Sequence, residues 1–191
     1  ASFAHEQEKV HERWPAALRF ITERGLNEFF AEGADDIGIV VQGGCYNTVI
    51  RALQLCKLAD AYGNTQVPLY VMNVAYPLVD AELLRFCSGK RAVLLVEEGQ
   101  PNFVEQNIAT VLRQANVDTI LHGKDLLPVA GEYTTAAVLK GLRSFLRTYE
   151  RLPASATSAR KTFPLVAATS DPAEPALPID ANVHGRLPGF C

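Results

Sequence analysis

The strongest constraint on the fold of this chain is a repeated alternation of short apolar runs with segments of helical spacing. The apolar runs, rich in β-branched and aliphatic residues, lie at 37–41, 68–74, 92–96 and, more weakly, 119–122. The segments that follow them carry apolar residues three or four positions apart, at 47–61, 80–87, 103–115 and 134–149. Strands that are apolar throughout are typical of parallel sheets, because helices cover both faces of such sheets. The pattern therefore predicts an α/β fold, with a mostly parallel open sheet in a three-layer α/β/α arrangement joined by right-handed crossovers.

Composition divides the 191 residues into three parts. We expect residues 1–36 to form a helical N-terminal extension and residues 37–150 to form the α/β domain. Residues 151–191 contain six of the eleven prolines, and we expect them to form a linker that is ordered only where it lies on another surface. Because this linker ends abruptly at Cys191, the sequence indicates a segment of a longer protein.

The N-terminal extension is predicted to contain two short helices. Pro15 suits the first turn of a helix, and Gly25 suggests a break between the two helices. Leu26, Phe29 and Phe30 would then lie on the second helix at roughly helical spacing. On this interpretation the sheet begins only at residue 37.

The charge balance and the hydropathy exclude several classes of function. Eighteen basic residues against 21 acidic ones give a net charge of −3, so the chain has no basic excess with which to bind nucleic acid. No run of about 18 apolar residues is present, so no membrane span is predicted. The first residues do not resemble a secretory signal, and we expect a cytoplasmic protein.

The cysteines argue against a metal centre in this chain. Cys45, Cys56, Cys87 and Cys191 are far apart in the sequence, whereas zinc knuckles and iron–sulfur runs need thiolates only a few residues apart. We therefore expect no metal ligands, and we interpret the first three cysteines as inert core thiols.

The turn after the first predicted strand is a candidate binding site, because ligands approach the carboxyl ends of strands in an open parallel sheet. Gly43 and Gly44 would let the backbone pass close to a ligand, and the helix that follows offers free N–H groups to an anion. The turn matches neither the dinucleotide fingerprint nor the phosphate loop. The alternative is a tight strand-to-helix turn, with Asn47 or Thr48 as the helix cap.

Glu97 and Glu98 are candidates at the end of the third predicted strand. Neighbouring side chains of a strand point in opposite directions, so at most one of these carboxylates faces the crevice, where it could act as a general base. The alternative is that they cap the following helix or pair with a lysine or arginine. His122 and Lys124 lie near the same edge, and we interpret the histidine as structural. No nucleophile signature is present, so no catalytic residue is assigned.

Four segments together resemble one region of a known enzyme family: QGGCYNTVIRALQ (42–54), PLYVMNVAYPLV (68–79), GKRAVLLVEEGQPNFVEQ (89–106) and LHGKDLLPVAGEYT (121–134). They are similar to the middle region of the alpha subunit of indolepyruvate ferredoxin oxidoreductases, which are thiamine-diphosphate-dependent 2-oxoacid:ferredoxin oxidoreductases. The resemblance covers roughly residues 37–149. It implies a domain like the transketolase C-terminal domain, also known as domain II of pyruvate:ferredoxin oxidoreductases, followed by a diphosphate-binding domain that this chain lacks.

The resemblance also implies an activity for the whole enzyme. Such enzymes oxidatively decarboxylate aryl 2-oxo acids such as indolepyruvate to acyl-CoA and pass electrons to ferredoxin. Their cofactors are thiamine diphosphate, Mg²⁺ and 4Fe–4S clusters, with coenzyme A as a substrate. The implied partners are the other domains of the subunit, a beta subunit and ferredoxin, and the resemblance is compatible with a homo-oligomer.

For this chain the resemblance implies a supporting role. The sequence has no GDG signature for magnesium-bound diphosphate and no clustered cysteines, so we expect no cofactor in it and no activity from it alone. Gly43, Gly44, Asn47, Glu97 and Glu98 would then face a neighbouring domain or subunit near the active site. The alternative is a free-standing Rossmann-like domain that binds a small anionic ligand at the Gly43–Gly44 turn.

Overall fold

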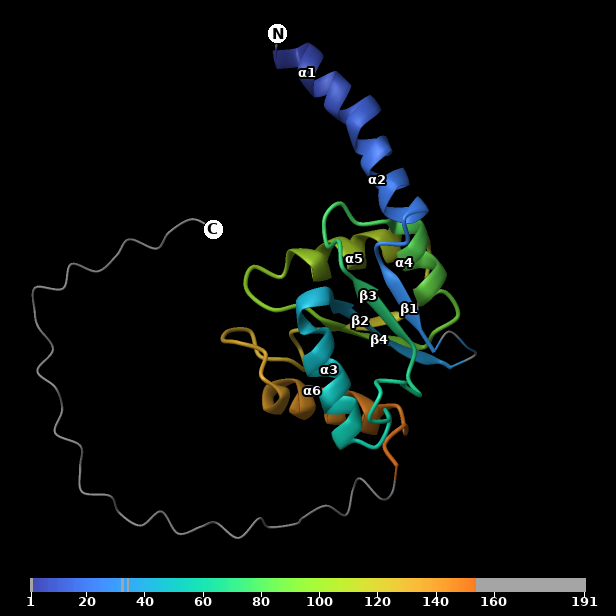
Figure 1. Ribbon diagram of the computed structural model, residues 1–191, viewed down its shortest axis with the longest axis vertical. Coiled ribbons are helices and arrows are strands. Elements are labelled where there is room, and N and C mark those ends of the chain that lie inside the picture. The colour runs from blue at the N-terminus through green and yellow to red at the C-terminus, as the bar shows by residue number, and fades with distance from the viewer. Residues whose placement is uncertain (1, 32, 34, 154–191) are drawn as a thin grey trace, which may run out of the picture. The chain divides into compact units, whose positions relative to one another are not determined.

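The computed structural model describes residues 2–31, 33 and 35–153 (Figure 1). Its helices are α1 (Ser2–Glu8), α2 (Trp14–Glu23), α3 (Tyr46–Leu55), α4 (Asp80–Cys87), α5 (Phe103–Gln114) and α6 (Thr135–Thr148). Its strands are β1 (Glu28–Phe30), β2 (Ile37–Gln42), β3 (Leu69–Met72), β4 (Ala92–Val96) and β5 (Ile120–His122). A π-helical turn, η1 (Lys9–Arg13), joins α1 to α2, and a 3₁₀ turn, η2 (Gly43–Cys45), leads into α3.

The five strands form one sheet in the order β1-β3-β2-β4-β5. Strands β3, β2, β4 and β5 are parallel, with Ile39 of β2 opposite Leu69 of β3 on one side and Leu94 of β4 on the other. Strand β1 pairs with β3 in the antiparallel direction and forms one edge. The predicted α/β fold with a mostly parallel open sheet is therefore confirmed.

Both faces of the sheet are buried, which explains why its central strands are apolar throughout. In β2, Ile39 and Val41 pack with α3 and α6, whereas Val40 packs on the other face with α4 and α5. All three side chains are fully buried. Burial of one such side chain contributes about 1.5–3 kcal/mol, so the two apolar layers hold the sheet between its helices.

The predicted second helix around Phe29 and Phe30 is wrong, because these residues form strand β1. Helix α2 ends at Glu23, and Gly25 adopts a φ of +57°, which suits the end of a helix. Phe29 stacks on Tyr70 on one face of the sheet, and Phe30 stacks on Tyr46 on the other. Adjacent phenylalanines that bury on opposite faces have the period of a strand.

Other boundaries differ less from the expected ones. Helix α3 ends at Leu55 instead of Ala61, where Lys57 takes a φ of +59° and the chain leaves the helix. Asp60 then accepts the backbone N–H groups of Tyr62 and Asn64 and holds a turn. In the described part of the chain, no helix combines the length and apolar character needed to cross a membrane.

The division of the chain into an N-terminal extension (1–36), an α/β domain (37–150) and a linker (151–191) stays a prediction. The edge strand β1 nevertheless shows that residues 28–30, assigned to the helical extension, are part of the sheet. The predicted linker over residues 151–191 lies outside the described residues from 154 onward.

Candidate functional site

The carboxyl ends of β2 and β4 mark the point where the strand order reverses. From β2 the chain moves to β3 on one side, and then to β4 and β5 on the other. Such a switch point leaves a crevice in which open α/β sheets bind ligands. The residues that follow these two strands are the predicted candidates Gly43, Gly44, Glu97 and Glu98. The structure therefore brings four of the five candidates to one place.

Gln42 joins the two strand ends directly. Its side-chain oxygen accepts the backbone N–H of Glu98 at 3.1 Å. Next to this bond lies a cavity of about 300 Å³, lined by residues of the β2–α3 turn, the end of β4 and the start of α6: Gly44, Cys45, Thr48, Glu98, Glu132, Tyr133 and Thr134. The cavity lies at the first turns of α3 and α6.

Gly43 and Gly44 have different roles in the turn after β2. A Cβ atom on Gly43 would lie 2.6 Å from the side-chain oxygen of Asn73, at the end of β3, whereas one on Gly44 would meet nothing within 4 Å. The close approach at Gly43 is therefore made by Asn73 of the same chain. Only Gly44 borders the cavity.

Asn47 does not take the capping role that one interpretation of the turn gave it, and that it faces a neighbouring domain stays a prediction. It is exposed and does not line the cavity. Neither Asn47 nor Thr48 caps α3, because the 3₁₀ turn η2 runs directly into the helix and no side chain accepts the first N–H groups. The predicted capping role of these two residues is wrong.

Glu97 is buried, and both of its carboxylate oxygens serve the N-terminus of α5. They accept the backbone N–H groups of Val104 and Glu105 at 3.0 Å each, and the residue is 4% exposed. The first N–H groups of a helix lack partners within the helix, and a negative charge near them is favourable. This geometry favours the capping interpretation of Glu97 over the catalytic one.

Glu98 points the other way, as the alternation of a strand requires, and lines the cavity. Its carboxylate accepts the backbone N–H of Tyr133 at 2.5 Å. Cys45 lies on the same wall. Burial raises the pKa of the Cys45 thiol, and the negative charge of Glu98 acts in the same direction. Cys45 is therefore a thiol at neutral pH, which is a poor nucleophile.

Lys124 holds the loop between β5 and α6 against the end of β4. Its amine donates to the backbone oxygen of Glu97 at 2.5 Å and to the hydroxyl of Tyr133 at 2.7 Å. Tyr133 in turn donates to the backbone oxygen of Pro128 at 2.8 Å. Burial raises the pKa of Tyr133 to about 12, and the charges of nearby acidic groups add to the effect. The hydroxyl therefore stays protonated and keeps its role as a donor.

His122 takes part in a separate set of bonds beside this loop. Its Nδ1 lies 2.6 Å from the carboxylate of Asp125, and its Nε2 lies 2.8 Å from the hydroxyl of Tyr149. Asp125 also accepts the backbone N–H of Gly123 at 2.7 Å. The ring packs edge-on against Phe145. These contacts fix the turn after β5 and support the structural interpretation of His122.

Tyr133 is a residue of this site that no local sequence pattern predicts, although it lies in one of the segments that carry the family resemblance. It joins Glu98 to Lys124 at the switch point. Tyr133 is distant from both Glu98 and Lys124 in the sequence, so no local sequence pattern indicates that the three residues meet.

The donors at the switch point do not fit a diphosphate. The carboxylates of Glu98 and Glu132 line the cavity, and the amine of Lys124 is bonded to Glu97 and Tyr133. Two negative side chains oppose an anion in the same space. Among the described residues, no group of three or more His, Cys, Asp or Glu side chains could hold a metal ion.

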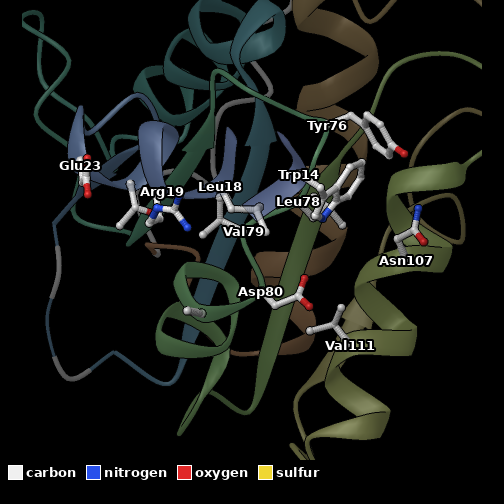
Figure 2. A pocket seen from close by; sticks show the side chains of 12 residues that line it. Trp14, Leu18, Arg19, Glu23, Tyr76, Leu78, Val79, Asp80, Asn107 and Val111 are labelled. Carbon is white, nitrogen blue, oxygen red and sulfur yellow. The ribbon is translucent and has the colours of Figure 1, made fainter. Parts of the chain in front are cut away.

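A second and larger hollow lies on the face covered by α4 and α5. It has a volume of about 650 Å³ and lies between α2, the connection from β3 to α4, and α5 (Figure 2). Trp14 and Tyr76 meet edge to face at its rim, with ring centroids 5.2 Å apart. Leu18, Leu78 and Val111 give it an apolar lining. No local sequence pattern predicts this groove, because its residues come from segments far apart in the chain.

Comparisons with known proteins identify relatives over the greater part of this chain. Indolepyruvate oxidoreductase subunit IorA of Methanothermobacter thermautotrophicus is 32% identical over 123 residues, which are 63% of this chain and 19% of that protein. The subunit of the same name from Pyrococcus horikoshii is 31% identical over 117 residues, which are 60% of this chain and 17% of that protein. The match thus spans about a fifth of the length of these curated relatives. The predicted resemblance to this alpha subunit is confirmed.

Two further comparisons add less. A solved structure of 2-oxoglutarate:ferredoxin oxidoreductase from Magnetococcus marinus, with 2-oxoglutarate, coenzyme A and succinyl-CoA bound, superposes with a TM-score of 0.42 and 19% identity. The superposition covers 66% of this chain and 20% of that one. No family model matches the chain.

Proposed function

We propose that this chain is the middle domain of the alpha subunit of an indolepyruvate ferredoxin oxidoreductase. The whole enzyme would oxidatively decarboxylate indolepyruvate or a related aryl 2-oxo acid, pass electrons to ferredoxin and form acyl-CoA. The observation that carries the proposal is the similarity to two proteins named indolepyruvate oxidoreductase subunit IorA, at 31–32% identity over 117–123 residues. The proposed location is the cytoplasm.

Within that enzyme, the role we propose for this domain is structural docking. The side chains at the switch point are mostly engaged in hydrogen bonds within the domain. Glu97 accepts backbone N–H groups of α5, and Glu98 accepts the backbone N–H of Tyr133. Lys124 donates to the backbone oxygen of Glu97 and to the hydroxyl of Tyr133. A network of this kind shapes a rigid edge, but it leaves no free acid–base pair for catalysis. Thiamine diphosphate, Mg²⁺ and the 4Fe–4S clusters are accordingly assigned to other parts of the subunit. The proposed partners are those parts, the beta subunit and ferredoxin.

Calorimetry on the 191-residue chain tests the assignment of the cofactors. We expect no heat of binding when thiamine diphosphate and Mg²⁺ are titrated into the chain, and no reduction of ferredoxin when indolepyruvate and coenzyme A are added. Binding with micromolar affinity would contradict the proposal. Binding of inorganic phosphate that is lost in Gly44→Asp, but kept in an exposed variant away from the cavity such as Gly33→Asp, would support the alternative of a free-standing anion-binding domain.

A substitution in the intact subunit tests the docking role against a catalytic role of Glu98. If Glu98 only shapes the edge, Glu98→Gln keeps the length of the side chain and an acceptor oxygen for Tyr133, so the turnover number stays within about twofold of wild type. A loss of two or more orders of magnitude, without loss of stability, would show that Glu98 acts as an acid or base.

A further inference from the structure

The chain leaves helix α6 through a turn that usually contains glycine. The backbone N–H of Glu150 donates to the carbonyl of Arg147 at 3.1 Å. The next N–H, that of Arg151, donates to the carbonyl of Leu146 at 2.8 Å. This is the bond pattern of a Schellman turn, in which the residue after the cap is left-handed. Glu150 holds that position with a φ of +57°, which is unfavourable for a residue with a side chain, so the turn depends on contacts beyond it.

The residue that follows the left-handed glutamate is bound by two neighbouring carboxylates. The guanidinium of Arg151 donates to the carboxylate of Asp35 and, at 2.9 Å, to that of Asp36. Both aspartates directly precede β2. The side chain of Asp35 is 19% exposed, and those of Asp36 and Arg151 are each 43% exposed, so water and salt reach these ion pairs.

Arg91 extends this group of charges to the start of β4. Its guanidinium lies 3.1 Å from the carboxylate of Asp36 and donates to the backbone oxygen of Tyr149 at 3.4 Å. The hydrogen bond from Arg151 holds the pKa of Asp36 below its ordinary value, and the charge of Arg91 acts in the same direction. Asp36 is therefore ionised at neutral pH and faces both arginines.

We propose that these charges form an electrostatic latch, which holds the end of α6 at the amino edge of the sheet and opens locally while the domain stays folded. The members of the latch are Asp35, Asp36, Arg91 and Arg151. They come before β2, before β4 and after α6, so the latch lies at the edge opposite to the carboxyl ends of the strands, where the candidate site lies. When closed, it fixes the direction in which the chain leaves the domain. The latch is independent of the proposed enzymatic role.

Two features favour local opening of the latch. Ion pairs between partly exposed side chains contribute little each, and dissolved salt screens them. The left-handed conformation of Glu150 also works against the closed state. Leu142, in the middle of α6, is only 1% exposed and packs in the core. The end of the helix should therefore open more often than its middle, to a degree that depends on charge.

Hydrogen exchange of single amides, measured by NMR on the 191-residue chain, tests the latch. The amide of Arg151 reports on the turn, and the amide of Leu142 reports on unfolding of the domain. In low concentrations of urea, exchange at Arg151 should be faster than at Leu142 and nearly independent of urea, because local opening exposes little surface. Asp36→Asn removes the carboxylate that faces both arginines, and it should lower the protection of the Arg151 amide about three- to tenfold.

Salt provides a second measurement of the same charges. Raising NaCl from about 0.02 to about 0.5 M should lower the protection of the Arg151 amide in wild type. The double variant Asp35→Asn/Asp36→Asn lacks both carboxylates, so salt should have little effect on it. Asp118→Asn removes an exposed carboxylate at the same edge of the sheet, and it should behave as wild type.

A compensating substitution connects the latch to the strained turn. Glycine takes the left-handed conformation without penalty, so adding Glu150→Gly to Asp36→Asn should restore protection of the Arg151 amide. Equal protection of this amide in Asp36→Asn and wild type would overturn the proposal. So would a dependence on urea at Arg151 as steep as that at Leu142, because the turn would then open only when the whole domain unfolds.

Discussion

The backbone N–H of Tyr133 donates to the carboxylate of Glu98 at 2.5 Å, and this bond joins the end of β4 to the residue that precedes the cap of α6. The hydroxyl of the same tyrosine accepts a hydrogen bond from Lys124 and donates to Pro128. One residue therefore ties the loop after β5 to the switch point of the sheet.

Tyr133→Phe should lower stability and change its dependence on alkaline pH. The folded pKa of Tyr133 is about 12 against about 10 in the unfolded chain, so its contribution is complete below about pH 10. Between about pH 10 and 12 the unfolded state releases the proton first, and stability falls as pH rises.

Urea unfolding of wild type and Tyr133→Phe between pH 8 and 11 measures both effects. At pH 8 the variant should lose about 1–2 kcal/mol, because two hydrogen bonds are removed. The free energy of unfolding should fall less steeply with rising pH in the variant than in wild type. Some dependence on pH remains in the variant, because burial also raises the pKa of Tyr70. Parallel slopes in the two proteins would show that Tyr133 does not titrate as proposed.

Glu97→Gln should destabilise the chain more than Glu98→Gln. Glu97 is buried and accepts two backbone N–H groups of α5, and a glutamine in its place would turn an NH₂ donor toward one of them. An unsatisfied buried donor costs about 1–3 kcal/mol. Glu98 is exposed and accepts a single bond, so its variant should lose less than about 1 kcal/mol. Urea midpoints at pH 7 give the comparison, and equal losses would refute the capping role.

Gly43→Ala and Gly44→Ala form a matched pair one residue apart. A Cβ on Gly43 would lie 2.6 Å from the side-chain oxygen of Asn73, which is held in place by its bonds to Leu26 and Glu28. We expect Gly43→Ala to lose about 1–3 kcal/mol through overpacking. Gly44→Ala meets open space and should change the free energy of unfolding by no more than about 0.5 kcal/mol. Thermal unfolding distinguishes them, and the reverse order would show that the tight packing lies at Gly44.

Asp125→Asn should flatten the loss of stability in acid. Burial acts to raise the pKa of Asp125, but hydrogen bonds from His122 and the backbone of Gly123 outweigh it and hold the pKa below its ordinary value. The carboxylate therefore contributes stability above the unfolded pKa of about 4, and this contribution disappears as pH falls through the lower folded pKa.

Urea midpoints between about pH 2 and pH 6 test this prediction. The wild-type curve should fall more steeply below about pH 4 than the curve of Asp125→Asn. Asp118→Asn, at another exposed aspartate, serves as the control and should follow wild type. If Asp125→Asn retains the wild-type slope, the His122–Asp125 pair does not stabilise the fold.

The local pattern of apolar residues predicts most helices and strands, but it does not predict the edge strand β1 or the contacts at the candidate site. The run at 92–96 predicted β4 at its observed bounds, because five consecutive apolar residues between polar ones admit few alternatives. Phe29 and Phe30 fit the predicted helix equally well, because two adjacent aromatic residues have no visible period by themselves. Their burial on opposite faces becomes evident only when β1 pairs with β3.

The same limit applies at the candidate site. The alternation of a strand predicted that Glu97 and Glu98 diverge, and the structure has them diverge. Which of the two is buried depends on where α5 begins relative to β4. The position of Tyr133, 35 residues after Glu98, depends on the path of the loop after β5.

The sequence alone determined the class of fold, the alternation of strands and helices, and the resemblance to the alpha subunit of an oxidoreductase, because these follow from the periodicity of side chains and from short motifs. The tertiary structure decided the order of the strands, the antiparallel edge, and which carboxylate caps a helix and which lines a cavity. It also placed the groove beside Trp14. These features depend on contacts between residues distant in the chain, and their free energies arise only when the layers pack together.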